Sequence, residues 1–306
     1  MYRWLTKTQE KMSGSFCNSR TQSDEALLLI CGTKVSIPQA LFSLIHDSFV
    51  KALTSSDTFK IALSGGSLPS FLSELSQSFV TAGISPQWEK WHIILADERV
   101  VPSNHKDSNM KALIDSFLLD IPIPKNQIYG IDEELLEDST KTIASEYQKR
   151  VFFPSLDREN HQETNVLLDC AILGFGPDGH TCSLFPDHDL LEEDDLYVAG
   201  IDDSPKHPPK RITLTLKTLN DHTRDVIFVG AGSSKSPILQ DIFETVTFEK
   251  KTAVAVDQRN CNIVMKDVKV CHPCGMVRPR HGNLYYITDS EGTELLDIKP
   301  SICSCL

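Results

Sequence analysis

Short apolar runs alternate along this chain with longer stretches in which apolar residues recur at helical spacing. Strands are predicted at Ala26–Cys31, Lys60–Leu63, His92–Ala96, Leu167–Leu173 and Val226–Val229. Helices are predicted between them, following Pro38 and beginning at Pro69, Asp107 and Ser236. Because the strands are almost continuously apolar, both faces of their sheet should be covered. The alternation predicts a Rossmann-like α/β fold, with a mainly parallel sheet and helices on both faces.

The two ends of the chain differ from the region between them. Residues 1–25 are polar, rich in Ser and Thr and without hydrophobic periodicity, and are expected to form a disordered extension. Residues 26–298 are expected to form a single α/β domain, followed by a tail over 299–306. Within that domain, Asp132–Glu163 is charged and predicts a helix around Thr142–Phe152, whereas Asp202–Lys210 is a Pro-rich loop. Neither stretch is typical of a domain linker.

Length, composition and net charge limit the kinds of molecule that this protein is expected to bind. With 306 residues, 40% of them hydrophobic, the chain is long enough to bury a substantial core. Its formal net charge of −12 argues against a nucleic-acid or anionic-membrane surface, since both require a positive field. No apolar run approaches the ~20 residues that span a bilayer, and the N-terminus lacks the apolar region of a secretory signal. A cytoplasmic protein is therefore expected.

The nine cysteines are spread along the chain. Without a secretory signal they are interpreted as thiols. Cys271 and Cys274, together with Cys303 and Cys305, could supply four zinc-binding thiolates. Because a Cys-x-Cys pair at a chain end is not a usual second half of such a site, ordinary loop and tail cysteines are the favoured interpretation. No metal site is predicted.

A glycine-rich turn follows the strand that ends at Leu173. It reads Gly174-Phe175-Gly176-Pro177-Asp178-Gly179-His180-Thr181. Glycine permits positive φ and a close approach to backbone, and histidine has an ordinary pKa of ~6.5, close to neutral pH. His180 is therefore a candidate general base. Asp178 is expected to orient its imidazole or to shape the turn.

The same glycines match the G-x-G-x-x-G pattern of a dinucleotide-binding turn. That turn must open directly into a long helix, whose N-terminus receives the pyrophosphate. Here Pro177 lies inside the turn and Pro186 follows soon after, so only a short helical segment fits. The acidic run at 192–195 is better interpreted as a solvated cluster than as a ribose ligand. No cofactor is predicted.

Three other strand ends carry glycines or charges. Ser64-Gly65-Gly66-Ser67 follows one strand, and its backbone amides could bind an anion, although an ordinary tight turn would also use glycine. Asp97-Glu98-Arg99 follows the next strand, and an arginine there could hold a phosphate through two hydrogen bonds. Gly230–Lys235 again places small residues before a lysine. Together these ends predict a cleft for a phosphorylated small molecule.

The chemistry expected in this cleft is hydrolysis by a histidine-activated water. The chain has no Gly-x-Ser-x-Gly elbow and no His-Glu-x-x-His motif, so a serine hydrolase or a zinc hydrolase is not favoured. General-base assistance contributes roughly 10²–10⁴-fold, which suits a substrate that already hydrolyses readily.

As an ordered set, these motifs with Arg211-Ile212-Thr213 and Gly232-Ser233-Ser234-Lys235 resemble the 6-phosphogluconolactonase family over Ala26–Leu296. The resemblance implies a fold shared with glucosamine-6-phosphate deaminase and ribose-5-phosphate isomerase. It also implies metal-independent hydrolysis of a phosphorylated sugar lactone in the pentose phosphate pathway, with His180 activating water. By the same resemblance, phosphate contacts fall to Arg99, Lys235 and the Ser64 to Ser67 loop, with Arg211 and Asp97 close by.

Two alternatives stay open. The deaminase pattern resembles this one but carries a glutamate five residues after the histidine, where this chain has Phe185, and a tyrosine in place of Arg99. A non-catalytic sugar-phosphate sensor could use the same pocket, although the presence of both Asp178 and His180 favours an enzyme. Two departures from the lactonase pattern are Cys182 in place of alanine and the poorly matching stretch Asn262–Arg280. A monomer or weak homodimer is expected.

Overall fold

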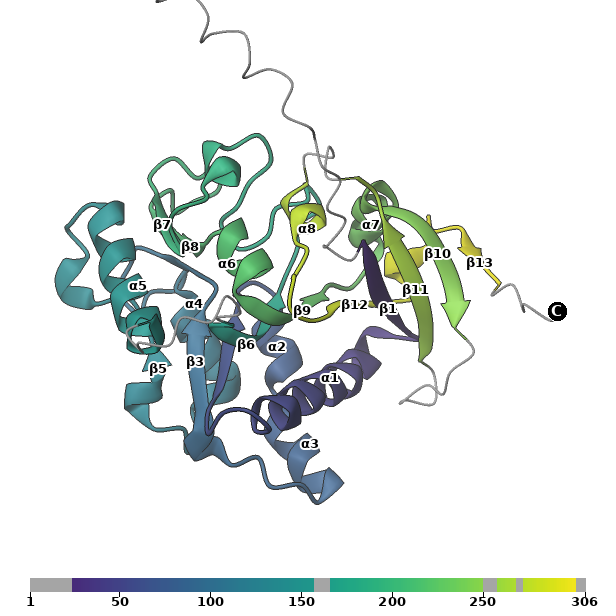
Figure 1. Cartoon of the computed structure of the whole chain (residues 1–306), viewed down its shortest axis with the longest axis horizontal. Helices are drawn as coiled ribbons and strands as arrows, with labels where there is room; N and C mark the ends of the chain where they lie inside the picture. The colour runs from purple at the N-terminus through teal and green to yellow at the C-terminus, as the bar shows by residue number, and fades with distance from the viewer. Residues whose placement is uncertain (1–23, 157–165, 250–257, 268–271, 301–306) are drawn as a thin grey trace, which may run out of the picture.

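The computed structural model describes residues 24–156, 166–249, 258–267 and 272–300, and within them the main element is a ten-stranded mixed sheet (Figure 1). In spatial order its strands are β13 (Ile298–Lys299), β10 (Phe243–Glu249), β11 (Arg259–Met265), β1 (Glu25–Cys31), β12 (Leu284–Asp289), β9 (Thr223–Val229), β6 (Leu168–Leu173), β2 (Phe59–Leu63), β3 (Trp91–Leu95) and β5 (Ile128–Tyr129). Neighbours from β1 to β5 in this order are parallel. The predicted mainly parallel sheet is confirmed.

Helices cover both faces of the sheet, as predicted. They are α1 (Ile37–Ala52), α2 (Leu68–Leu72), α3 (Leu75–Ala82), α4 (Asn109–Leu113), α5 (Thr140–Leu156), α6 (Leu216–Asp221), α7 (Ser236–Ile242) and α8 (Pro273–Met276). The chain moves along the sheet in one direction through β1, β2, β3 and β5, and in the other from β6 to β9. Because parallel crossovers are right-handed, α1 and α3 lie on one side of the sheet and α6 and α8 on the other (Figure 1).

The predicted elements are found with small shifts at their ends. The helix expected from Asp107 begins at Asn109, because the Ser108 hydroxyl caps it by accepting the Lys111 amide at 3.1 Å. The helix expected around Thr142–Phe152 extends over Thr140–Leu156. The elements that were not predicted include the parallel strands β5 and β12, the antiparallel β10–β11 ribbon, which joins β1 through β11, and a separate three-stranded sheet.

The separate sheet contains Asp97–Arg99, which was predicted to lie in the loop that follows a strand. Asp97–Arg99 forms β4, which pairs antiparallel with β8 (Arg211–Leu214), and β8 pairs with β7 (Val198–Ile201). In this register Arg99 and Arg211 are direct partners. Directly opposed residues lie about 4.5–5.5 Å apart at their Cα atoms, so the pairing brings two cations from distant parts of the chain together.

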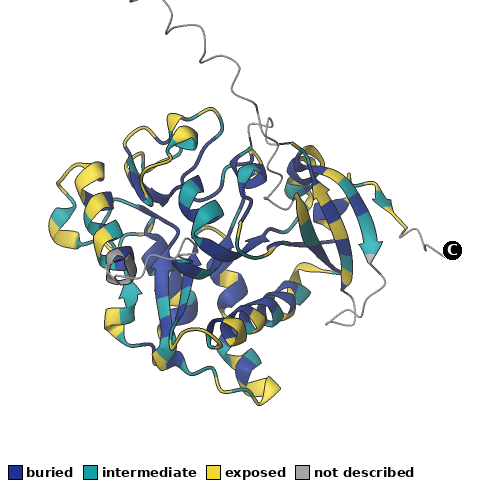
Figure 2. Cartoon of the chain, in the orientation of Figure 1, coloured by how far each residue is buried: buried dark blue, intermediate teal, exposed yellow. Residues whose placement is uncertain are grey.

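Burial is concentrated in the central strands, which are dark blue in Figure 2. All residues of β9 are buried, and a continuous aromatic cluster lies at the amino ends of β2 and β3: Phe49, Phe59, Phe79, Trp88 and Trp91. Each large apolar side chain fully buried in this way stabilises the fold by roughly 1.5–3 kcal/mol. The cluster therefore packs the amino ends of β2 and β3 firmly, at the opposite end of these strands from their carboxyl ends.

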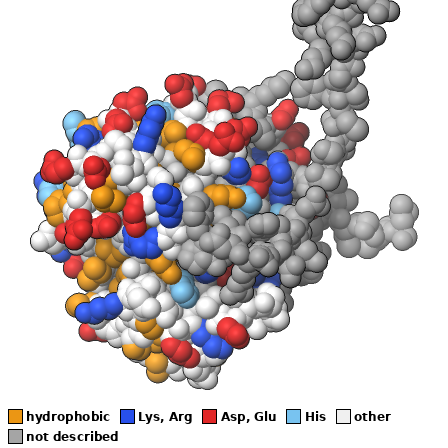
Figure 3. Space-filling view, turned by 60° about the vertical axis from the view of Figure 1, so that its left-hand side comes forward, with side chains coloured by type: hydrophobic (Ala, Val, Ile, Leu, Met, Phe, Trp, Pro, Cys, Tyr) orange, Lys and Arg blue, Asp and Glu red, His pale blue; other side chains and the backbone are white. Residues whose placement is uncertain are grey.

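The surface carries many acidic side chains, as the negative net charge of the sequence leads one to expect (Figure 3). On the face shown in Figure 3, acidic side chains are distributed between basic and apolar ones. Among the described residues, none of the helices has both the length and the apolar character needed to cross a bilayer. The expected disordered extension at 1–25 falls almost wholly outside the described residues, as do Cys271, Cys303 and Cys305 of the zinc alternative.

Candidate active site

A cavity of about 340 Å³ lies at the carboxyl ends of β2, β6 and β9. At β6 and β2 the direction of the chain along the sheet reverses, and ligands of open α/β sheets bind at such a point. Its walls come from the four predicted strand ends, the start of α4, the loop before β8 and β8 itself: Ser64, Gly65, Gly66, Ser67, Asp97, Arg99, Asn109, Gly174, Phe175, Gly176, His180, Cys182, Lys206, His207, Arg211, Val229 and Lys235. The structure thus brings together every predicted site residue except Asp178, which contacts the cavity through His180.

The glycine-rich turn after β6 is held by its own backbone. Gly176 donates to the His180 carbonyl at 2.9 Å, and Gly179, with φ of +83°, donates to the Gly176 carbonyl at 3.0 Å. The Thr181 hydroxyl closes the turn on the Gly174 carbonyl at 2.8 Å. A Cβ at position 176 would collide with the His180 ring and the Asp178 carboxylate. Glycine is therefore required here, because the two functional side chains fold back over the backbone.

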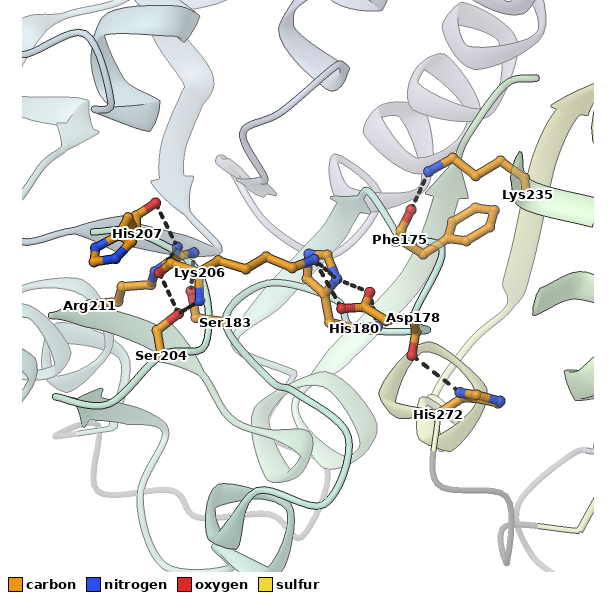
Figure 4. A network of polar contacts seen from close by, with 10 residues as sticks. All are labelled: Phe175, Asp178, His180, Ser183, Ser204, Lys206, His207, Arg211, Lys235 and His272. Atoms are coloured by element: carbon orange, nitrogen blue, oxygen red, sulfur yellow. Dashed lines mark hydrogen bonds and ion pairs between the residues drawn. The ribbon is translucent and has the colours of Figure 1, made fainter. Parts of the chain in front are cut away.

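His180 and Asp178 form a hydrogen-bonded pair, shown in Figure 4. The contact joins His180 Nδ1 to Asp178 Oδ1. A carboxylate only accepts hydrogen bonds, so the imidazole proton is on Nδ1 and the lone pair is on Nε2. Burial alone would raise the pKa of Asp178, but hydrogen bonds from His180 and Lys206 outweigh it and hold that pKa well below its usual range. Asp178 is therefore ionised and fixes the tautomer of His180.

His180 is kept neutral by its surroundings. Burial lowers its pKa and the Lys206 charge adds to that effect, while Asp178 and Asp97 act in the opposite direction. Part of this burial comes from Phe185, whose ring stacks on the imidazole at a centroid distance of 5.2 Å and an angle of 20°. A neutral imidazole whose Nε2 carries the lone pair can act as a general base near neutral pH.

The Ser64–Ser67 loop presents polar groups to the cavity. Ser64 is anchored by its amide, which donates to the Ile172 carbonyl at 3.1 Å, and Gly66 has φ of +68°. A Cβ on Gly65 would overlap the side chain of Asn109. Among the described residues, the Cys182 thiol, a weak hydrogen-bonding group, is the side chain that interacts with the buried Ser64 hydroxyl, which makes no hydrogen bond to nitrogen or oxygen. A buried hydroxyl left in this state is ready to bind a polar ligand.

The Asp97-Glu98-Arg99 segment is organised by its central residue. Glu98 is buried and accepts hydrogen bonds from the amides of Arg99, Asn109 and Met110 and from the Ser108 hydroxyl, all between 2.7 and 3.0 Å. Burial raises the pKa of Glu98, although these hydrogen bonds oppose the effect. Glu98 therefore ties β4 to the start of α4, while its neighbours Asp97 and Arg99 line the cavity.

Asp97 is a buried acceptor in this wall. It receives the Ser183 hydroxyl at 2.8 Å and the Asn109 carboxamide at 3.2 Å. The same carboxamide nitrogen also donates to the Asp97 carbonyl at 2.8 Å. Asp97 and Asn109 are thus held rigidly beside the Ser64–Ser67 loop.

Three predicted anion ligands line the cavity, and none has a carboxylate ion pair among the described residues. Arg99 donates through Nη1 to the Asp107 carbonyl at 2.6 Å, and its buried Nε has no partner in the described structure. Lys235 donates to the Phe175 carbonyl at 2.5 Å, and burial lowers its pKa. Arg211 donates to the carbonyls of residues 206–208 and, through Nη1 at 3.4 Å, to the Ser183 hydroxyl. Arg211 is buried and Arg99 and Lys235 are partly buried, and cations in such positions without a carboxylate partner favour an anionic ligand.

Sequence reasoning missed Lys206 and Asn109 as site residues. Lys206 lies in the Pro-rich loop that was noted before Arg211, but its partners cannot be read from that loop. Asn109 follows a predicted helix start, which gave no sign of a cavity position. The poorly matching stretch Asn262–Arg280 also contributes, because His272 lies 3.3 Å from the Asp178 carbonyl and the Cys274 amide donates to the Gly179 carbonyl at 3.0 Å. Cys274 is a buried free thiol.

Comparison with known proteins agrees with this geometry. Residues 32–285 match the family model described as glucosamine-6-phosphate isomerases/6-phosphogluconolactonase. The chain is 37% identical to 6-phosphogluconolactonase of Homo sapiens over 242 residues, which cover 78% of this chain and 81% of that protein. It is 37% identical to the probable 6-phosphogluconolactonase of Schizosaccharomyces pombe over 227 residues, covering 71% and 84%.

Solved structures support the fold. The structure is similar to that of 6-phosphogluconolactonase from Trypanosoma cruzi, with a TM-score of 0.68 at 22% identity, covering 90% of this chain and 98% of that one. It is also similar to a monomeric glucosamine-6-phosphate deaminase, with a TM-score of 0.63 at 16% identity, covering 88% and 99%. The predicted similarity of this fold to that of glucosamine-6-phosphate deaminase is confirmed. The chain belongs to the glucosamine-6-phosphate isomerase/6-phosphogluconolactonase family.

Proposed function

We propose that this protein is a 6-phosphogluconolactonase, which hydrolyses 6-phospho-D-glucono-1,5-lactone to 6-phospho-D-gluconate in the oxidative pentose phosphate pathway. Its relatives at 37% identity carry that name. The observation that carries the proposal is the neutral His180, oriented by Asp178, at the edge of a cavity that also holds the unpaired guanidinium of Arg99. A base and an anion site in one cavity match a phosphorylated substrate that reacts with water.

The proposed reaction begins at Nε2 of His180. This atom takes a proton from a water molecule as the water oxygen attacks the lactone carbonyl carbon, and the carbonyl oxygen becomes an oxyanion. When the ring carbon–oxygen bond breaks, the imidazolium returns the proton to the leaving ring oxygen. The product is an open-chain acid with a free hydroxyl, and His180 is neutral again. Asp178 stabilises the imidazolium between these two steps.

Phosphate binding is proposed at the side of the cavity formed by Arg99 and the Ser64–Ser67 loop. Among the described residues, the Nε of Arg99 and the hydroxyl of Ser64 are donors there that make no hydrogen bond to nitrogen or oxygen. Lys235, which lies on the other side of His180 from Arg211 in Figure 4, is proposed as a further anion contact. Binding energy from the distant phosphate would orient the carbonyl toward His180.

Phe185 separates this proposal from deaminase chemistry. The deaminase pattern needs a carboxylate at this position to assist ring opening, but here a buried phenyl ring stacks on the imidazole. That ring can only desolvate the base. We further propose that the protein acts in the cytoplasm as a monomer or weak homodimer, without a cofactor, a nucleic-acid partner or a membrane partner.

The test is hydrolysis of freshly generated lactone, followed by acid release and corrected for the spontaneous rate, with a chelator present. His180→Ala should abolish the acceleration. His188→Ala is the matched control, because His188 also pairs with an aspartate, Asp203, at 3.1 Å, but lies outside the cavity. No acceleration by the folded wild-type protein would contradict the proposal, and bound but unreacted sugar phosphate would then support the sensor alternative.

A further inference from the structure

The loop between β7 and β8 is built to present one lysine to the catalytic pair. Arg211, itself only 3% exposed, donates through Nε to the Pro208 carbonyl at 2.8 Å and through Nη2 to the Lys206 carbonyl at 2.7 Å. The Ser204 hydroxyl donates to the same Lys206 carbonyl at 2.9 Å and accepts the Lys206 amide at 3.2 Å. The backbone of Lys206 is thus held from both sides, as Figure 4 shows.

The side chain of Lys206 extends from this clamp to the His180–Asp178 pair (Figure 4). Its ammonium lies 3.0 Å from Asp178 Oδ2 and 2.9 Å from His180 Nδ1. Since Nδ1 already carries the proton that it donates to Asp178 Oδ1, the ammonium cannot also donate to Nδ1. Lys206 therefore donates to Oδ2, and its approach to Nδ1 places a positive charge directly beside the imidazole.

We propose that Lys206 is a positioning residue of the reaction, which shares the Asp178 carboxylate with His180 and so favours the neutral, proton-accepting form of the imidazole. The catalytic role given to Lys206 rests on the proposed function. The effect of the Lys206 charge on the protonation of His180 can be measured without any substrate.

Two effects of Lys206 act in the same direction. Its charge repels an imidazolium, and its hydrogen bond takes up part of the Asp178 charge that would otherwise stabilise one. The direction of the His180 pKa agrees with this geometry, since burial lowers it first and the Lys206 charge lowers it further. The charged or titratable groups around the pair come from the turn itself, β4, the β7–β8 loop, β8, η7 (Ser233–Lys235) and the residue before α8: Asp178, Asp97, Arg99, Lys206, His207, Arg211, Lys235 and His272.

Among these groups, Lys206 is the cation in direct contact with both members of the pair. Lys235 donates to the Phe175 carbonyl instead, and Arg211 donates to the loop carbonyls. His272 contacts the Asp178 carbonyl rather than its carboxylate. Removing Lys206 should therefore change the protonation of His180 more than removal of any other nearby cation.

The experiment is an NMR titration of the His180 ring in the full-length protein without substrate. The His180 signal is assigned by its loss in His180→Gln. Lys206→Met should raise the pKa of His180 by roughly half a pH unit or more, the scale expected of a partly exposed ion pair. Lys206→Arg should leave it close to wild type. Lys210→Met, which removes the same charge from an exposed position in the same loop, is the control.

The lactonase pH profile provides the functional readout. In Lys206→Met the acid limb of kcat/KM should move to higher pH together with the NMR titration. An unchanged His180 titration in Lys206→Met, or an equal shift in Lys210→Met, would overturn the inference. A raised KM with an unmoved acid limb would also overturn it, by making Lys206 a substrate contact. Absence of lactonase activity in the wild type would refute the proposed function alone, because the titration needs no substrate.

Discussion

Asp178→Asn tests most directly whether the orientation of His180 makes this protein a catalyst. The substitution keeps the size and shape of the side chain but replaces one carboxylate oxygen with a donor group. In the wild type, Asp178 receives the His180 Nδ1 proton and the Lys206 ammonium and also lies 3.4 Å from the His180 amide. The asparagine amide can instead donate to Nδ1, which places the imidazole proton on Nε2 and removes the base.

The expected loss follows from the two functions that Asp178 performs. Correct general-base catalysis contributes roughly 10²–10⁴-fold, and the asparagine variant of a serine-protease triad, in which the wrong tautomer forms, loses about 10⁴-fold in kcat. We therefore expect kcat to fall by roughly 10²–10⁴-fold. KM should change little, because Asp178 does not line the cavity where the phosphate is proposed to bind.

The assay measures acid release from freshly generated lactone, with the spontaneous rate subtracted at each pH. Asp203→Asn is the matched control, because Asp203 pairs with His188 on the surface in a similar Asp–His contact. Circular dichroism and thermal unfolding show whether each variant is folded. A folded Asp178→Asn protein that kept kcat within about threefold of wild type would refute the orienting role, given the size of the general-base term.

Three further predictions concern the same cavity. Arg99→Met should raise KM roughly ten- to hundredfold with a small effect on kcat, since hydrogen bonds to charged groups are worth about 1.5–3 kcal/mol; an unchanged KM would remove Arg99 from the phosphate site. Gly176→Ala should lower kcat at least about tenfold, because the added Cβ displaces the His180 and Asp178 side chains; full activity would show that the turn adjusts without cost. In the wild type, kcat/KM should fall only below the ordinary histidine pKa of 6.5, because burial lowers the pKa of His180 and only its neutral form accepts a proton; an acid limb above that value would contradict this assignment.

Local patterns were sufficient for much of the fold. Most of the parallel strands and the helices between them were predicted because each leaves a short-range signal: an apolar run, a helical spacing or a turn residue. The parallel strands β5 and β12 were not predicted. The antiparallel β10–β11 ribbon and the sheet that contains Asp97–Arg99 were missed. The pairings of β4 with β8 and of β1 with β11 join segments far apart in the chain, and a three-residue strand such as β4 carries almost no periodicity of its own.

The candidate site likewise has features that were predicted from the sequence and features that were not. By itself, the sequence determined which strand ends carry the chemistry, because glycine at 176 and 179, and the Asp178 and His180 that they present, are requirements of one short turn. The surroundings of that turn depend on how distant segments pack. This packing placed Lys206 beside a histidine 26 positions away in the sequence and turned Arg211 toward the loop carbonyls. The reason is physical: a turn conformation depends on neighbouring residues, whereas an ion pair between distant segments forms only where the packed sheet brings them together.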